Sequence, residues 1–386
     1  MKHVIVALSA AVFFALAAGA QTPPAAPPAA PPPFPMGPRT PFDTVVSPEV
    51  SADRHVTFRF YAPKAQSVVL KPWFIEDSAP PIPLTKGADG VWSVTTGPID
   101  PGVYGYRFIV DDATVADPRN LMYLPQMREM HSLVEIPGGP DDPQTYHAGI
   151  PHGAVVERYY DSPVAGPGRR LHLYLPPGYE KGKNYPVLYL LHGGGASDFS
   201  WPNEGRANFI LDTLIAQGKA KPMVVVFPNG VIEGSNPMFN SPGQDKFGAE
   251  LMTVIVPMIE SQYKVSKKPE MRAIAGLSMG GMQTLNIGLT HTKDFRYIGI
   301  FSSGWFPEML TKFEADHGAT LKADTANLKL FWIAHGATDM ARTNSLAMMK
   351  MFDRHGVKYQ WEETPGGHTM VNWRRYLGEF APLLFR

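Results

Sequence analysis

The stretch Arg272-Ala-Ile-Ala-Gly-Leu-Ser-Met-Gly-Gly281 decides the fold. Its first residues, Arg272 to Ala275, predict a buried strand, and the residues after Ser278 predict a helix. Between them lies Gly276-Leu-Ser-Met-Gly280, a G-x-S-x-G pattern. A serine on a sharp strand-to-helix turn needs small neighbours, because the turn strains its backbone. The pattern therefore predicts that the Ser278 hydroxyl stands clear of a sheet, at the N-terminus of a helix.

Strands and helices are predicted to alternate on both sides of this turn, which indicates an α/β domain with a mostly parallel sheet covered on both faces. Two runs, 185–191 and 222–227, are apolar throughout, as buried parallel strands are. The expected strands are 171–175, 185–191, 222–227, 272–275, 297–301, 328–334 and 358–363. The expected helices are 209–217, 247–263, the segment after Ser278, and 343–355.

Residues 43–137 have a different pattern, with short runs that alternate between apolar and polar residues and are separated by turn residues. The clearest runs are 55–61, 91–95 and 103–110. Period-two runs at this spacing predict a small β-sandwich. A Pro-, Gly- and Asp-rich linker at 138–155 is then expected to lead into the α/β domain at 156–386.

The first 42 residues are expected to lie outside both domains. Residues 1–20 resemble a secretory signal, with Lys2 and His3 ahead of an apolar run and Ala18-Gly19-Ala20 as the cleavage pattern. An uncleaved anchor is the alternative, although the run is short for a membrane span. Residues 21–42 are rich in Pro and Ala and predict an extended tether. We therefore expect a secreted or periplasmic protein.

Composition narrows the range of partners. Lys plus Arg and Asp plus Glu both number 35, so neither nucleic acid nor an anionic membrane surface is indicated. The chain has no cysteine, which excludes disulfides, thiolate metal sites and a cysteine nucleophile. No metal and no cofactor is expected, and the oligomeric state is left open.

A serine nucleophile needs a base, and in the α/β-hydrolase fold the chain order is Ser, acid, His. His368 follows the strand predicted at 358–363, in Pro365-Gly-Gly-His368, so it is the expected base. Asp339 follows the strand at 328–334 and is the expected acid, which would orient the imidazole. His335 lies ahead of the acid, and we leave open that it lines the pocket.

Acyl transfer also needs hydrogen-bond donors for the oxyanion. The run Leu191-His-Gly-Gly-Gly195 follows a predicted strand and suits this purpose. We expect the backbone amides of Met279 and Gly194 to be the donors, with Gly193 as the near alternative to Gly194.

The sequence resembles a known family over roughly residues 150 to 386. The segments 190–195, Gly205-Arg-Ala-Asn208, 272–281, Asn286-Ile-Gly-Leu-Thr290 and Gly366-Gly-His368 resemble feruloyl esterases of carbohydrate esterase family 1, within the esterase D-like group. The resemblance implies an α/β-hydrolase fold and hydrolysis of ester groups on plant xylan through an acyl-enzyme on Ser278. It also implies the triad Ser278, Asp339 and His368.

The sandwich more loosely resembles the immunoglobulin-like module that precedes such esterases, through 58–63, Gly90-Val-Trp92 and 102–106. This module is a possible carbohydrate-binding module, and Trp73 or Trp92 is a candidate glycan contact, with core packing the better role for Trp92.

In the catalytic domain, Trp201, Trp305 and His192 are the expected substrate contacts, with Trp373 a further candidate. Core packing is the alternative role for each tryptophan. The expected partner is an ester-decorated plant polysaccharide or oligosaccharide.

The activity itself has alternatives. An acetyl xylan esterase, a siderophore ester hydrolase, an acyltransferase and a non-catalytic glycan-binding protein all remain open at this point.

Overall fold

The computed structural model describes residues 39–75, 79–126, 129–140, 142–235 and 245–386. The predicted signal at 1–20 and most of the predicted tether at 21–42 lie outside these residues. A short helix, α1 (Pro41–Thr44), begins within the last two residues of that predicted tether. Residues Pro41–Arg386 form one compact unit.

Two antiparallel sheets make up the N-terminal part of this unit. One sheet has the order β1-β2-β6-β5 and the other β4-β3-β7-β10-β9, with β8 paired to β7. The strands are β1 (Glu49–Val50), β2 (Val56–Tyr61), β3 (Val68–Pro72), β4 (Ile82–Pro83), β5 (Thr85–Lys86), β6 (Val91–Thr96), β7 (Gly102–Val110), β8 (Ala113–Val115), β9 (Tyr123–Pro125) and β10 (Met130–Ile136). In β2, every second residue is buried, because alternate side chains of a strand face the core. The predicted sandwich is confirmed.

The second part is built on one sheet of eight strands in the order β11-β12-β14-β13-β15-β16-β17-β18. The strands from β14 to β18 in this order run parallel, whereas β11 and β12 are antiparallel additions at one edge. Their bounds are β11 (Ala154–Ser162), β12 (Gly166–Leu175), β13 (Val187–Leu191), β14 (Val224–Pro228), β15 (Arg272–Leu277), β16 (Tyr297–Phe301), β17 (Leu330–Gly336) and β18 (Gln360–Thr364). This is the expected α/β-hydrolase fold with a mostly parallel sheet.

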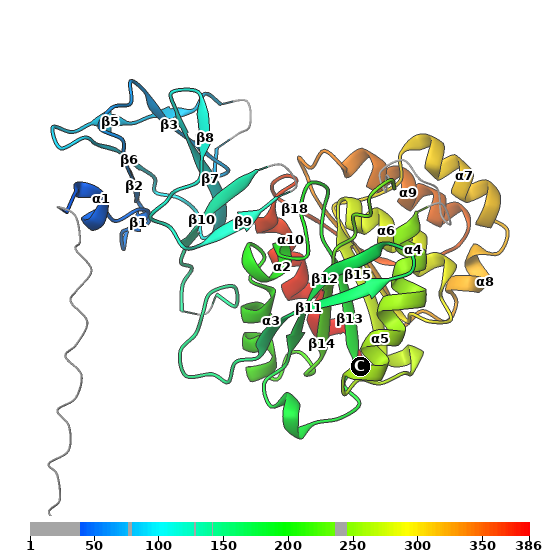
Figure 1. Cartoon of the computed structure of the whole chain (residues 1–386). Helices are drawn as coiled ribbons and strands as arrows, with labels where there is room; N and C mark the ends of the chain where they lie inside the picture. The colour runs from blue at the N-terminus through cyan, green and yellow to red at the C-terminus, as the bar shows by residue number, and fades with distance from the viewer. Residues whose placement is uncertain (1–38, 76–78, 127–128, 141, 236–244) are drawn as a thin grey trace, which may run out of the picture. The chain divides into compact units, whose positions relative to one another are not determined.

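Helices cover both faces of this sheet, so each face has its own apolar core (Figure 1). One face carries α2 (Ser200–Asn203), α3 (Ala207–Ala216) and α10 (Met370–Phe380). The other carries α4 (Lys246–Glu250), α5 (Val256–Gln262), α6 (Met279–Thr290), α7 (Pro307–His317), α8 (Leu321–Thr325) and α9 (Arg342–Arg354). A π-helical segment, Leu251–Ile255, joins α4 to α5, and 3-10 turns occur at Tyr179–Lys181, Pro269–Met271 and Ala381–Leu383.

Strand β11 and helix α10 are two of the elements that the sequence analysis did not predict. Strand β11 is mostly exposed, and its side chains lack the apolar alternation that identifies a half-buried strand. Helix α10 directly follows His368, and its first residue, Met370, is buried.

The sandwich contacts the α/β part through side chains from α2, α10 and the segment between α2 and α3. Arg206 forms an ion pair with Glu135 of β10, with 2.9 Å between Nη2 and Oε2. Asn203 donates to the carbonyl of Tyr123 at 3.3 Å. Phe199, ahead of α2, packs with a small apolar group of sandwich residues that includes Val103.

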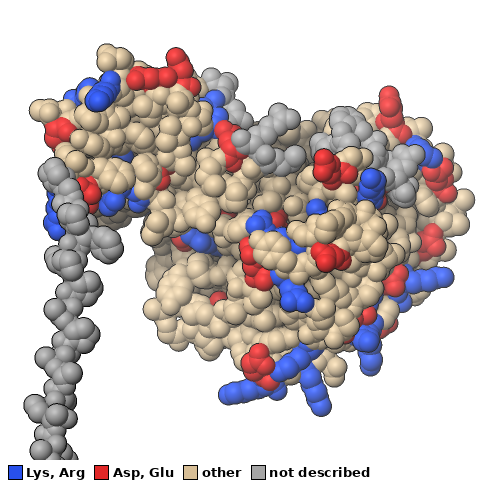
Figure 2. All heavy atoms as spheres, in the orientation of Figure 1, with Lys and Arg blue, Asp and Glu red and all other residues tan. Residues whose placement is uncertain are grey.

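On the face shown in Figure 2, basic and acidic side chains are interspersed over most of the surface.

Candidate active site

Ser278 lies between β15 and α6, in a backbone conformation with φ 52° and ψ −118°. The two glycines of the motif make this turn possible. A Cβ on Gly276 would lie 2.4 Å from the carbonyl oxygen of Gly280, and one on Gly280 would lie 2.4 Å from that of His192. Neither position has room for a side chain, so the chain can turn sharply and hold the Ser278 hydroxyl at the edge of the sheet.

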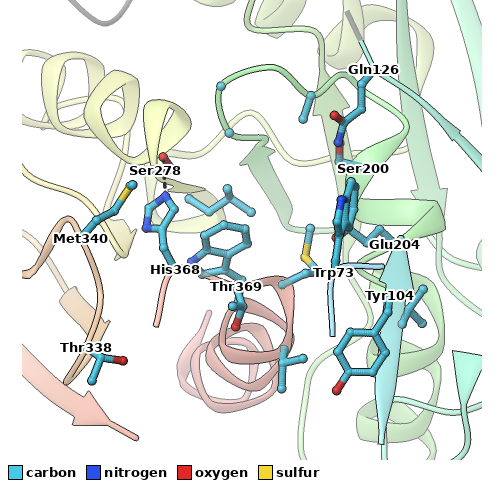
Figure 3. Close-up of a pocket in the computed structure, with 18 of the residues that line it drawn as sticks. Trp73, Tyr104, Gln126, Ser200, Glu204, Ser278, Thr338, Met340, His368 and Thr369 are labelled. Carbon is cyan, nitrogen blue, oxygen red and sulfur yellow. Dashed lines mark hydrogen bonds between the residues drawn. The ribbon is translucent and has the colours of Figure 1, made fainter. Parts of the chain in front are cut away.

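His368 connects the predicted nucleophile to the predicted acid (Figure 3). Its Nε2 lies 2.9 Å from Ser278 Oγ, and its Nδ1 lies 2.8 Å from Asp339 Oδ1. With Nδ1–H donating to the carboxylate, Nε2 is left free to accept the serine hydroxyl proton. The structure thus brings together three residues from three separate strand ends.

Asp339 is buried, and its Oδ1 also accepts a hydrogen bond from the Ala341 amide at 2.8 Å. Burial alone raises the pKa of this carboxyl. The hydrogen bonds that the carboxylate accepts, from His368 and from the Ala341 amide among others, act together with the nearby charge of His368 to outweigh burial, so the pKa lies below its ordinary value. The carboxylate therefore stays ionised at neutral pH and can stabilise an imidazolium.

The two residues predicted to donate to the oxyanion lie close together, and both are next to the nucleophile in the structure. A Cβ built on Gly194 would lie 3.9 Å from the Cβ of Met279. Met279 is the first residue of α6, where backbone N–H groups have no partner within the helix. Gly194 and Gly193 both line the cavity beside Ser278.

His192 holds this loop rather than contacting substrate. Only 1% of its surface is exposed, so the predicted substrate contact is wrong for this structure. Its Nδ1 hydrogen-bonds the Gly193 carbonyl at 2.8 Å, and its Nε2 accepts from the Gly230 amide at 3.0 Å. Burial lowers the pKa of His192, consistent with a neutral ring that accepts at Nε2.

Trp201 and Trp305 are also core residues, which corrects the prediction that they contact substrate. Both have 0% exposure. Trp201 donates its indole N–H to the Leu191 carbonyl at 3.0 Å, and Trp305 donates to Asn286 Oδ1 at 2.7 Å. Their expected positions in loops after strands suggested exposure, but the Trp201 and Trp305 indoles are buried in the apolar cores on the two faces of the sheet.

His335 is likewise buried, within 3.2 Å of Glu363, and does not line the cavity.

A cavity of about 640 Å³ opens around Ser278 and His368. Thr338 and Met340 lie on one side of this pair, and Trp73 and Glu204 lie on the other (Figure 3). The apolar side chains that line the cavity include those of Trp73, Ile75, Val103, Met370, Val371 and Trp373. The cavity therefore offers different surroundings to the two halves of a bound ester.

Glu204 is a buried cavity residue that the sequence analysis did not single out. Only 8% of its surface is exposed, and its side chain forms no hydrogen bond with any residue that the structure describes. Burial raises its pKa to about 8, against the opposing charge of Arg374. Glu204 directly precedes the family-like segment Gly205–Asn208. The sequence gives no reason to single out Glu204 itself, and its position in the folded chain identifies it.

Among the described residues, no group of three or more His, Cys, Asp or Glu side chains is placed to hold a metal ion. The described part of the chain also contains no helix long and apolar enough to cross a bilayer.

Two family models match this chain. The model described as "Putative esterase" matches residues 162–382, and that of carbohydrate-binding module 48 (isoamylase N-terminal domain) matches residues 41–123. The first match covers the α/β part, and the second covers most of the sandwich.

Individual proteins agree with these matches. An endo-1,4-beta-xylanase/feruloyl esterase from Xylanibacter ruminicola is 33% identical over 352 residues, which are 88% of this chain and 46% of that protein. The chain therefore spans about half the length of this relative.

Two solved structures are similar in fold. A carbohydrate esterase family 1 ferulic acid esterase from Anaeromyces mucronatus, in complex with ferulic acid, is 25% identical with a TM-score of 0.56, covering 64% of this chain and 96% of that one. The enterobactin esterase of Shigella flexneri has a TM-score of 0.61 at 19% identity, covering 85% of this chain and 92% of that one, and shows a shared fold. The chain belongs to the esterase family, with an N-terminal module similar to carbohydrate-binding module 48.

Proposed function

We propose that this protein hydrolyses feruloyl (hydroxycinnamoyl) esters on plant xylan through an acyl-enzyme on Ser278. The observation that carries the proposal is the chain of contacts from Ser278 Oγ to His368 to Asp339 within a cavity large enough for an aromatic acyl group. The likeness to the Xylanibacter ruminicola xylanase/feruloyl esterase supports this choice of ester.

The proposed reaction has two halves. In the first, His368 takes the proton of Ser278 as Oγ attacks the ester carbonyl, and it returns that proton to the departing sugar hydroxyl. In the second half, His368 activates water in the same way, and the carboxylic acid leaves Ser278. The amides of Gly194 and Met279 would stabilise the oxyanion in both halves, each worth about 3–4 kcal/mol.

Export fits this substrate, because xylan lies outside the cell. The pattern at 1–20 supports a secreted or periplasmic location. The partner in this proposal is an ester-decorated xylan or a fragment of it.

Replacement of the nucleophile tests the mechanism. We expect Ser278→Ala to lower kcat on methyl ferulate by about 10⁴-fold or more, because among the described residues the Ser278 hydroxyl is the one that hydrogen-bonds Nε2 of the base. The measurement is release of ferulate by purified protein. Ser261→Ala is the matched control, since Ser261 is an exposed serine of α5 that lies away from the cavity.

A panel of methyl ferulate, acetylated xylan and a catecholate siderophore separates feruloyl esterase from its alternatives. Faster hydrolysis of either of the last two would contradict the feruloyl proposal, and full activity of Ser278→Ala would contradict the acyl-enzyme.

A further inference from the structure

The sandwich supplies one wall of the cavity that contains Ser278. Trp73 follows β3, and Val103 and Tyr104 belong to β7, so these wall residues come from two neighbouring strands of one sheet. The wall is therefore formed by ordered sheet structure and its immediate continuation.

The indole of Trp73 is held in place from two sides. A Cβ on Gly105 would lie 2.4 Å from the indole ring, so the ring lies against bare backbone at that position. The ring of His131 lies 4.6 Å from it, centroid to centroid. A ring fixed in this way loses little conformational freedom when a ligand packs on it.

Glu204 adds an acidic group to this side of the cavity, where Trp73, Tyr104, Gln126 and Ser200 also lie (Figure 3). Its carboxyl is buried and has no hydrogen-bond partner among the described residues, although such partners are the rule for buried polar groups. The one opposing charge that acts on it is Arg374 of α10. Since its pKa is raised to about 8, the carboxyl is protonated at neutral pH and can both donate and accept.

The other side of the nucleophile is open. Met340 is 80% exposed, and Thr338 lies beside it in the loop after β17. A polysaccharide chain needs an open path away from Ser278, whereas a compact acyl group does not. The two sides of the cavity are thus suited to the two halves of a feruloylated sugar.

We propose that the sandwich and the α/β domain together form an acyl subsite, in which Trp73 packs against an aromatic acyl ring and Glu204 hydrogen-bonds the oxygen substituents of that ring. This inference rests on the proposed function, and it assigns specificity for phenolic over unsubstituted rings to Glu204. It also makes the sandwich part of the substrate pocket, in addition to any role in binding polysaccharide.

The test of Glu204 compares methyl ferulate with methyl cinnamate, whose ring carries no oxygen. We expect Glu204→Leu to lower the ratio of kcat/KM for ferulate over cinnamate by about tenfold or more, since an unpaired polar substituent is costly to bury. Glu204→Gln, which can still donate and accept, should keep most of that ratio. Rates on p-nitrophenyl acetate, whose acyl group carries no ring, report whether the triad is intact.

The test of Trp73 uses the same substrates. Trp73→Ala should lower kcat/KM for both ring esters by about tenfold after normalisation to the acetate ester, because it removes the aromatic contact. Trp361→Ala is the matched control, since Trp361 is 51% exposed and lies outside the cavity lining.

The outcomes separate this inference from the proposed function. A wild-type protein that cleaves p-nitrophenyl acetate but neither ring ester overturns the proposed function. If the wild-type protein prefers ferulate and Glu204→Leu keeps that preference, the inference is overturned but the proposed function stands. The same holds if Trp73→Ala lowers the ring-ester rates no more than Trp361→Ala does. If Glu204→Leu fails to fold, a tenfold loss of the ratio in Glu204→Gln also overturns it.

Discussion

Ser278 has a backbone conformation that residues with a side chain rarely adopt, and such a conformation costs about 1–3 kcal/mol. Hydrogen bonds hold it there: its amide donates to the Phe301 carbonyl at 2.9 Å, and its own carbonyl accepts from the Met282 amide at 3.0 Å. The Ser278 carbonyl also accepts a hydrogen bond from the Ser303 hydroxyl at 2.7 Å. The nucleophile is therefore positioned before substrate arrives, and binding energy need not be spent on orienting it.

Replacing Asp339 tests whether it is the acid that orients His368. Asp339→Asn should lower kcat by about 10⁴-fold, because an amide no longer favours the tautomer that leaves Nε2 of His368 free to accept. The measurement is kcat on p-nitrophenyl acetate at neutral pH.

Asp353→Asn is the matched control for this change. Asp353 also follows Ser278 and precedes His368 in the chain, but it lies in α9, where it accepts a hydrogen bond from Tyr359 at 2.8 Å. Equal activity of the two variants would count against Asp339 as the acid.

The candidate triad was predictable from sequence because each member follows a strand that the apolar pattern reveals. Glu204 was not predictable, since its importance depends on burial without a partner, which no local pattern encodes. Trp201 and Trp305 were predicted wrongly as substrate contacts for a related reason: position in a loop says nothing about the direction of the side chain.

The turn between β15 and α6, which holds Ser278, depends on close packing of α6 against the end of β13. The tightest contact is at Gly280, where a Cβ would lie 2.4 Å from the His192 carbonyl oxygen and 2.7 Å from the Leu191 Cβ. The same contact places the N-terminus of α6 beside the glycine loop after β13. Packing of two elements thus sets the spacing of the two predicted oxyanion donors.

Gly280→Ala should therefore destabilise the protein by about 1–3 kcal/mol and lower kcat, since the new methyl group pushes the loop at His192 away from Met279. Urea unfolding and hydrolysis of p-nitrophenyl acetate measure the two effects.

Gly378→Ala is the matched control, because a Cβ at that position of α10 meets no atom within 4 Å. In a helix it should be neutral or stabilise by about 0.5–1 kcal/mol. Similar losses in both variants would show that the approach of α6 to β13 is not responsible.

The elements that sequence predicted well are those with a strong apolar pattern, such as β16, whose predicted and observed bounds coincide at Tyr297–Phe301. The long helix expected at 247–263 is present as α4, the π-helical segment and α5 in succession. Strand β11 was missed because edge strands with an exposed face need no apolar alternation.

At the scale of the whole molecule, the sandwich and the α/β domain share a cavity and an ion pair. Arg206 and Glu135 have side-chain exposures of 16% and 23%, so water screens their attraction less than it would at the surface. The sequence revealed both domains but not their contact, because residues far apart in the chain leave no joint pattern.

A double-mutant cycle measures this contact. Arg206→Ala, Glu135→Ala and the double variant should give a coupling of about 1 kcal/mol or more in urea unfolding, because the charges are partly desolvated.

The pair Lys312–Asp316 within α7 is the control, with exposures of 51% and 47%. Exposed pairs at this spacing are worth about 0.3–0.5 kcal/mol. A coupling for Arg206 and Glu135 no larger than this would mean that the ion pair does little to join the domains.

The cavity draws on residues from Trp73 to Trp373, which come from the β3–β7 sheet of the sandwich and, at the other end, from helix α10. During synthesis, therefore, the pocket can be completed only after the residues from Trp73 to Trp373 have left the ribosome. A nascent chain, or one cut between the domains and separated, would lack part of it. Under the proposed function, hydrolysis of an aromatic ester therefore requires the sandwich and α10 together, and this activity is expected only after α10 has been synthesised.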